Sequence, residues 1–108
     1  MKARLNDAKQ RSRKHNIYFD LTYEDMLDMW SKQNGLCALS GIPMTHKIYA
    51  GKINTNLSID RIDSNKGYTR NNTLLVCSCV NMMKGMLTIE ELILFCKAIL
   101  NTQNLKNK

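Results

Sequence analysis

Long apolar runs are absent from this sequence. No stretch of about 18 apolar residues occurs, which is roughly the length that a membrane-spanning helix needs. The opening residues, MKARLNDAKQRSRK, are charged and contain no apolar segment of the kind found in secretory signals. We therefore expect the protein to act in the cytoplasm. Its 108 residues leave room for one domain with a modest core.

Acidic residues are scarce relative to basic ones. There are 9 Asp and Glu against 16 Lys and Arg, which gives a formal net charge of +7. This balance favours a polyanionic partner, because phosphate contacts release counterions. Nucleic acid is the first candidate and an acidic membrane surface the second. Aromatic residues make up only 6 % of the chain and mostly occupy core-like positions, which does not favour an RNA-binding surface built on base stacking.

Cysteines number only four, and no secretion signal accompanies them. In that setting we expect reduced thiols or metal ligands rather than a disulfide framework. The four are Cys37, Cys77, Cys79 and Cys96.

Residues 2–15 predict a basic helix, because most of them are good helix formers and Asp7 is the only acidic residue among them. The basic residues in question are Lys2, Arg4, Lys9, Arg11, Arg13 and Lys14. Two interpretations stay open at this point. The helix is either an arm that grips phosphates or an ordinary solvated helix face at a frayed terminus.

Two further helices are predicted from capping boxes, in which Thr22 precedes Asp25 and Thr88 precedes Glu91. The first should end near Gly35, and its apolar stripe should lie in the core. That stripe consists of Met26, Leu27, Met29 and Trp30. The second should pack on the core and leave a loose polar tail, NTQNLKNK. Its apolar residues are Ile89, Leu92, Ile93, Cys96, Ile99 and Leu100.

Between these helices, residues 57–62 alternate apolar and polar side chains and residues 73–77 form a second β-prone run. A loop of about ten residues joins them, and a helix follows directly, so the sequence predicts a ββα unit. We expect an α+β fold in one compact domain. Its parts are a basic arm and amphipathic helix (1–34), a ββα core (35–87) and a C-terminal packing helix with its tail (88–108).

The segment from Gly35 to Lys84 resembles the small phage endonucleases of the HNH family, also called ββα-metal or His-Me finger nucleases. The matching pieces are GLCALSGIPM, SIDRID, KGYT, NNTLLVC and VNMMK. The resemblance covers about half of the chain and agrees in order and spacing. It implies a phage-encoded enzyme in the host cytosol that hydrolyses DNA phosphodiester bonds with one divalent cation, Mg²⁺ or Mn²⁺, and leaves 5′-phosphate and 3′-hydroxyl ends.

The resemblance also implies roles for individual residues. Asp60 and Asn81 would hold the cation, and both offer the oxygen donors that hard cations prefer. Asn72 would pin the loop that presents the catalytic face. Apart from the resemblance, Asp63 lies three residues after Asp60, which in an extended strand points it to the opposite face, so we expect it to cap the loop. A role as a second metal ligand stays open if the strand ends by Ile62. Arg61 stands where most of the family carries a histidine that activates water.

A guanidinium cannot accept a proton, so Arg61 is not a general base. Either Arg61 clamps the scissile phosphate while His46, Tyr68 or hydroxide on the metal acts as the base, or cleavage has been lost and the chain is a DNA-binding or regulatory module. The sequence leaves both open, as it does a homodimer. Around the site, further basic residues are candidates for phosphate contacts. These are Lys47, Lys52, Lys66, Arg70 and Lys84.

Related enzymes often hold a structural zinc ion between two CxxC knuckles. Only Cys37 and Cys77 remain at those positions, because Ser40 and Val80 replace the second cysteine of each knuckle. We therefore do not expect structural Zn²⁺. The weaker alternative is a rebuilt site, made from Cys37, Cys77, Cys79 and His46.

Overall fold

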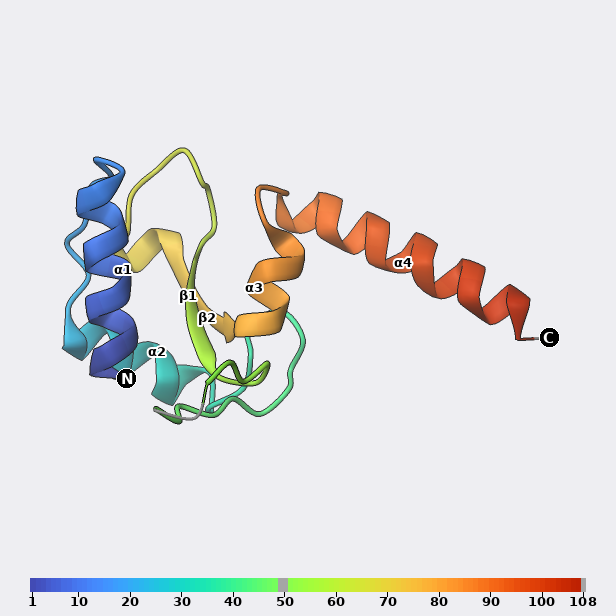
Figure 1. Ribbon diagram of the computed structural model, residues 1–108, viewed down its shortest axis with the longest axis horizontal. Helices are drawn as coiled ribbons and strands as arrows, with labels where there is room; N and C mark the ends of the chain where they lie inside the picture. Colours follow the sequence, from blue (N-terminus) through green and yellow to red (C-terminus); the bar gives the residue numbers. More distant parts are fainter. Residues whose placement is uncertain (49–50, 108) are drawn as a thin grey trace.

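A computed structural model describes residues 1–48 and 51–107 of the chain (Figure 1). It is an α+β structure with a two-stranded antiparallel sheet, as predicted. The elements run in the order α1 (Lys2–Lys14), α2 (Tyr23–Lys32), β1 (Leu57–Arg61), the 3₁₀ turn η1 (Arg70–Asn72), β2 (Thr73–Cys77), α3 (Ser78–Lys84) and α4 (Ile89–Lys106). Among the described residues, no helix is long and apolar enough to cross a membrane.

The sheet lies at the centre of the fold. β1 and β2 pair from Leu57 opposite Cys77 to Arg61 opposite Thr73. Helix α1 packs on β1, α2 packs on β2, and α3 packs on both strands (Figure 1). The largest fully buried side chains come from α2 and the two strands, namely Met26, Met29, Leu57, Thr73, Leu75, Val76 and Cys77. Strand β1 therefore packs against both α1 and α3.

Both predicted capping boxes are present. Thr22 Oγ1 accepts a hydrogen bond from the Asp25 amide at 3.1 Å, and the Asp25 carboxylate accepts one from the Thr22 amide at 3.0 Å. Thr88 and Glu91 make the same reciprocal pair at the start of α4. The core stripe of α2 was predicted correctly for Met26 and Met29, but Leu27 is exposed.

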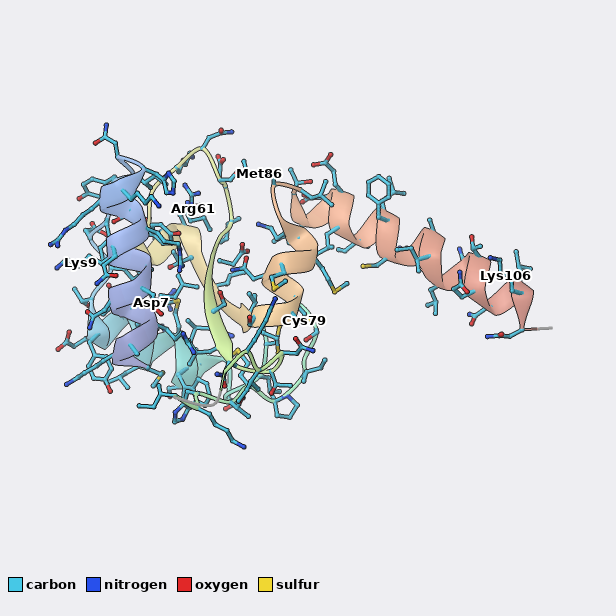
Figure 2. All side chains as sticks on the ribbon, in the orientation of Figure 1. Asp7, Lys9, Arg61, Cys79, Met86 and Lys106 are labelled. Carbon is cyan, nitrogen blue, oxygen red and sulfur yellow. The ribbon has the colours of Figure 1, made fainter. Side chains whose placement is uncertain are left out.

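The prediction that residues 88–108 pack on the core is wrong for most of their length. Helix α4 projects away from the body, and its side chains extend into open space on several sides (Figures 1 and 2). Leu92 is its only buried residue among those described. The spacing of apolar residues correctly predicted a helix. Its packing was not predicted, because helices α1, α2 and α3 already cover the short β1–β2 sheet. The polar tail, predicted to be loose, instead continues α4 to Lys106.

Candidate functional site

A pocket of about 210 Å³ lies where β1, α3, α1 and the loop after β1 meet. Its polar lining comes from residues far apart in the sequence. These include Arg11, Ser58, Asp60, Arg61, Tyr68, Asn81 and Lys84. The structure thus brings Asp60, Arg61 and Asn81 together, as a shared site requires.

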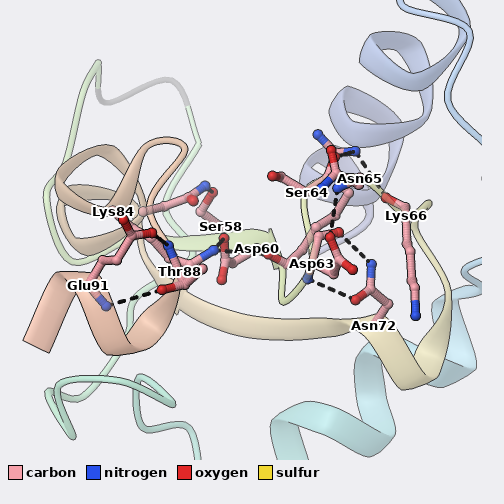
Figure 3. A network of polar contacts seen from close by, with 12 residues as sticks. Ser58, Asp60, Asp63, Ser64, Asn65, Lys66, Asn72, Lys84, Thr88 and Glu91 are labelled. Atoms are coloured by element: carbon pink, nitrogen blue, oxygen red, sulfur yellow. Dashed lines mark hydrogen bonds and ion pairs between the residues drawn. The ribbon is translucent and has the colours of Figure 1, made fainter.

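The meeting of β1 with α3 follows from two periodicities. Ser58 and Asp60 are two residues apart on a strand and face the same side, while Asn81 and Lys84 are three apart on a helix and share one face. Asn81 Nδ2 donates a hydrogen bond to Ser58 Oγ at 2.7 Å, and Lys84 Nζ donates one to Asp60 Oδ1 at 3.0 Å. Figure 3 shows Ser58, Asp60 and Lys84 in this part of the site.

Asp60 is buried, with 4 % of its surface exposed. Its second carboxylate oxygen, Oδ2, is also buried and has no hydrogen-bond partner in the described part of the chain. Burial raises the pKa of Asp60 above its usual range, while Lys84 and Arg61 act in the opposite direction. An unpartnered buried oxygen of this kind is costly and calls for an explanation, such as a ligand.

The donor set fits a hard divalent cation. Asp60 Oδ2 is unpartnered, and the Asn81 amide spends its Nδ2 on Ser58, which leaves its carbonyl oxygen for a ligand. Mg²⁺ is commonly held by only one or two protein side chains together with water and substrate phosphates. No group of three or more His, Cys, Asp or Glu side chains comes together within residues 1–48 and 51–107. In this pocket, Asp60 and Asn81 are the side chains that could supply such oxygen ligands.

Lys84, a candidate for phosphate contact, lines the pocket but is buried and already paired with another side chain. Its side chain is 2 % exposed, and its ammonium donates hydrogen bonds to Asp60 Oδ1 and to the Arg61 carbonyl, both at 3.0 Å. The N-x-x-K spacing turns Lys84 toward the sheet instead of the solvent, so its charge is committed to Asp60. This ion pair was not anticipated from the sequence.

Arg61 is fixed in place by the loop that follows it. Its guanidinium donates to the carbonyls of Ser64 at 2.9 Å and Lys66 at 3.0 Å, and it lies 5.2 Å from the centre of the Tyr68 ring. Tyr68 in turn packs against Phe19 with ring centres 5.5 Å apart. Arg61 is thus held at the pocket wall by one of its terminal nitrogens, and the rest of its fork can face a ligand.

Asn72 fastens the loop between the strands. Its side chain accepts a hydrogen bond from the Asp63 amide at 2.9 Å and donates one to the Asp63 carbonyl at 3.0 Å (Figure 3). It also donates to the Gly67 carbonyl at 2.9 Å. Asp63 Oδ1 accepts from the Asn65 amide at 2.9 Å, which caps the loop. These contacts shape the wall on which Arg61 and Tyr68 lie.

His46 lies outside the pocket, so the structure does not bring it to the candidate site. The segment before β1 bridges Thr45 to Asn56, which places His46 near the start of β1, whereas Asp60 lies near its end. The imidazole instead packs edge-on against Trp30 with ring centres 5.4 Å apart. Of the two side chains predicted as bases, Tyr68 alone lines the pocket.

A second hollow of about 260 Å³ continues the first along α1. The two share Arg11, Ser58 and Ile59. Together they form what we call the basic groove, whose polar side chains outside the first pocket are Arg4, Asp7, Lys52, Asn56 and Ser78. Ser58, Asn56 and Ser78 were not predicted from the sequence, because isolated Ser and Asn residues carry no spacing signal.

The other predicted phosphate contacts lie elsewhere. Lys2 Nζ sits 5.0 Å above the Tyr23 ring, and Arg70 forms an ion pair with Asp28 at 3.0 Å beside Lys32. Neither Lys2 nor Arg70 lines the groove, and each contacts a residue of α2 instead. The rest line neither pocket of the groove and are exposed, namely Lys9, Arg13, Lys14, Lys47 and Lys66.

The cysteines contribute nothing to this pocket. Cys37 and Cys77 are buried next to each other, and the Cys77 amide donates a hydrogen bond to Cys37 Sγ at 3.2 Å. Cys79 is half-buried, and Cys96 is exposed on α4. Because His46 packs on Trp30, the four ligands of the rebuilt zinc alternative do not gather.

Comparison with known proteins gives two viral relatives and no matching family model. The chain is 35 % identical over 86 residues to an uncharacterized 29.0 kDa protein of Enterobacteria phage T4 from the dda–modA intergenic region. That match covers 80 % of this chain and 31 % of the phage protein. An uncharacterized protein of Acanthamoeba polyphaga mimivirus is 44 % identical over 48 residues, which are 44 % of this chain and 9 % of that protein. The chain therefore spans less than a third of either relative, and both are viral.

Proposed function

We propose that this chain is an HNH-type DNA endonuclease that hydrolyses phosphodiester bonds with one divalent cation, Mg²⁺ or Mn²⁺. The observation that carries the proposal is that Asp60 and Asn81 line the same pocket, which forms one part of the basic groove. Asp60 offers a buried oxygen without a partner, and a phosphate backbone is the natural occupant of the groove.

The residues have distinct tasks in this proposal. Asp60 and Asn81 hold the cation, which when bound would stabilise the leaving oxygen of the phosphodiester. Arg61 directs its remaining N–H groups at the scissile phosphate. Arg4 and Arg11 grip the neighbouring backbone from α1, which binds without reading sequence. Asn72 is a positioning residue that keeps the loop under Arg61.

Water activation needs a different group from the family's histidine. Arg61 cannot accept a proton, and His46 lies at the other end of β1. Tyr68 lines the pocket and is the side chain that we propose for this task. Its ring contacts Arg61 on one side and Phe19 on another, so it is positioned next to the residue that we propose for the phosphate.

A second candidate function is a DNA-binding module that has lost cleavage. The Asp60–Lys84 ion pair and the arginine at position 61 favour it, because an ammonium already neutralises the carboxylate and the usual base is absent. Binding through the basic groove would be retained in such a module. Under either proposal the partner is DNA in the host cytoplasm, and a homodimer remains a prediction for sedimentation equilibrium to test.

Nicking of supercoiled plasmid separates the two functions. The wild-type chain is incubated with Mg²⁺, Mn²⁺ or EDTA, alongside Asn81→Ala and the control Asn71→Ala, an exposed asparagine outside the pocket. An endonuclease nicks only with a cation and loses this activity in Asn81→Ala alone. A binding module never nicks, yet it retains salt-sensitive binding to DNA.

A further inference from the structure

The ion pair inside the candidate site engages only one of the two carboxylate oxygens of Asp60. Oδ1 accepts a hydrogen bond from the Lys84 ammonium at 3.0 Å, and Oδ2 has no hydrogen-bond partner in the described part of the chain. The same ammonium also donates to the Arg61 carbonyl, which holds it in place. Lys84 therefore neutralises the carboxylate without using all of its acceptor capacity.

The charged side chains that line this pocket are mostly cations. They are Arg11, Arg61 and Lys84, against the single carboxylate of Asp60. The pocket is thus already positive before any ligand enters. A divalent cation would add to that surplus, and like charges in a partly buried site repel strongly. A phosphodiester removes part of the surplus, because each phosphate carries a negative charge.

We propose that Lys84 is an internal counter-ion that keeps Asp60 from taking up a divalent cation until a nucleic-acid phosphate has entered the pocket. This inference rests on the proposed function and adds an order of binding to it. Phosphate and cation then raise each other's affinity by the same factor. We expect a factor of at least about tenfold, within the range typical of coupled sites.

Electron paramagnetic resonance of free Mn²⁺ measures this coupling directly. The full chain is titrated with Mn²⁺ alone and with a short DNA duplex whose phosphorothioate linkages slow hydrolysis. Asp60→Asn, titrated in parallel, measures the Mn²⁺ taken up by the DNA itself. We expect weak uptake without DNA and Asp60-dependent uptake at least about tenfold tighter with it.

Uptake of equal affinity with and without DNA would overturn the inference. Plasmid nicking by the same preparation then separates the two claims, since nicking would leave the nuclease proposal standing. If Asp60 takes up no Mn²⁺ even with DNA, the inference fails together with the metal assignment. If no nicking occurs with any cation, the nuclease proposal fails.

Lys84→Met tests the role of the ammonium itself, and Lys66→Met removes an exposed cation as the matched control. We expect Lys84→Met to bind Mn²⁺ without DNA and to gain thermal stability from it. The wild-type chain and Lys66→Met should gain neither. An equal response of the two variants would contradict the proposal. If Lys84→Met does not fold even with Mn²⁺, the wild-type titration decides alone.

Discussion

Loss of the Lys84 ammonium should destabilise the fold severely. Lys84 and Asp60 are 2 % and 4 % exposed, so Lys84→Met leaves a carboxylate buried without its counter-ion. Breaking a buried ion pair on one side costs about 3–5 kcal/mol. A small domain has only about 5–15 kcal/mol of stability in total, so the variant should lose a large share of it. Urea unfolding followed by circular dichroism gives the difference.

Adding Asp60→Asn to Lys84→Met measures how much of the cost comes from the unpaired buried carboxylate, because the amide carries no charge. The double variant should recover about 1–3 kcal/mol relative to Lys84→Met. A cost below about 1 kcal/mol for Lys84→Met, no larger than that of a surface substitution, would refute the reasoning. Such a result would mean that water hydrates the Asp60 carboxylate once the lysine is removed.

The loss of stability in Lys84→Met should depend on pH in a defined direction. Burial raises the pKa of Asp60 in the folded state above the usual 3.8, and Lys84→Met removes the main opposing influence. A carboxyl whose folded pKa is raised contributes stability below its unfolded pKa and loses it as the pH rises through the folded value. The deficit of Lys84→Met should therefore shrink toward pH 4. A deficit that grows on acidification would contradict this assignment.

Three other variants test separate parts of the structure. Asn72→Ala removes three loop contacts and should cost about 1–3 kcal/mol in urea unfolding while abolishing nicking, and unchanged nicking would refute its positioning role. Arg11→Met should weaken DNA binding and lower the salt dependence by about one phosphate contact, whereas Arg13→Met, outside the groove, should change neither. Leu75→Ala should cost about 2–5 kcal/mol, but Leu100→Ala on exposed α4 about 0.5 kcal/mol or less, and equal costs would show that α4 is covered.

Local signals in the sequence predicted the elements well. The capping boxes at Thr22 and Thr88 fixed where two helices begin, because their hydrogen bonds involve residues only three apart. Alternation of apolar and polar residues located β1, and a short β-prone run located β2, because both are local patterns. Helix α4 was predicted as a helix, but its packing was not, since apolar spacing does not say whether a partner surface is available.

The candidate site was only half predictable. Asp60, Arg61 and Asn81 were chosen through a family resemblance, and the structure places all three around one pocket. The burial of Lys84 depends on how α3 crosses β1, which no local pattern contains. The available signal was that Asn81 and Lys84 share one face of a helix while Ser58 and Asp60 share one face of a strand. The sequence did not show that His46 lies away from the pocket, because that depends on the bridge between Thr45 and Asn56, which no local pattern predicts.

The proposed metal-dependent cleavage of DNA, with Asp60 as a metal ligand, is tested most directly by one comparison. Wild-type chain and Asp60→Asn are incubated with supercoiled plasmid in Mn²⁺, with DNA binding measured on the same samples. The account predicts that the wild-type chain nicks the plasmid, that EDTA stops it, and that Asp60→Asn binds DNA without nicking. Nicking by Asp60→Asn at the wild-type rate, or no nicking by either protein, would contradict it.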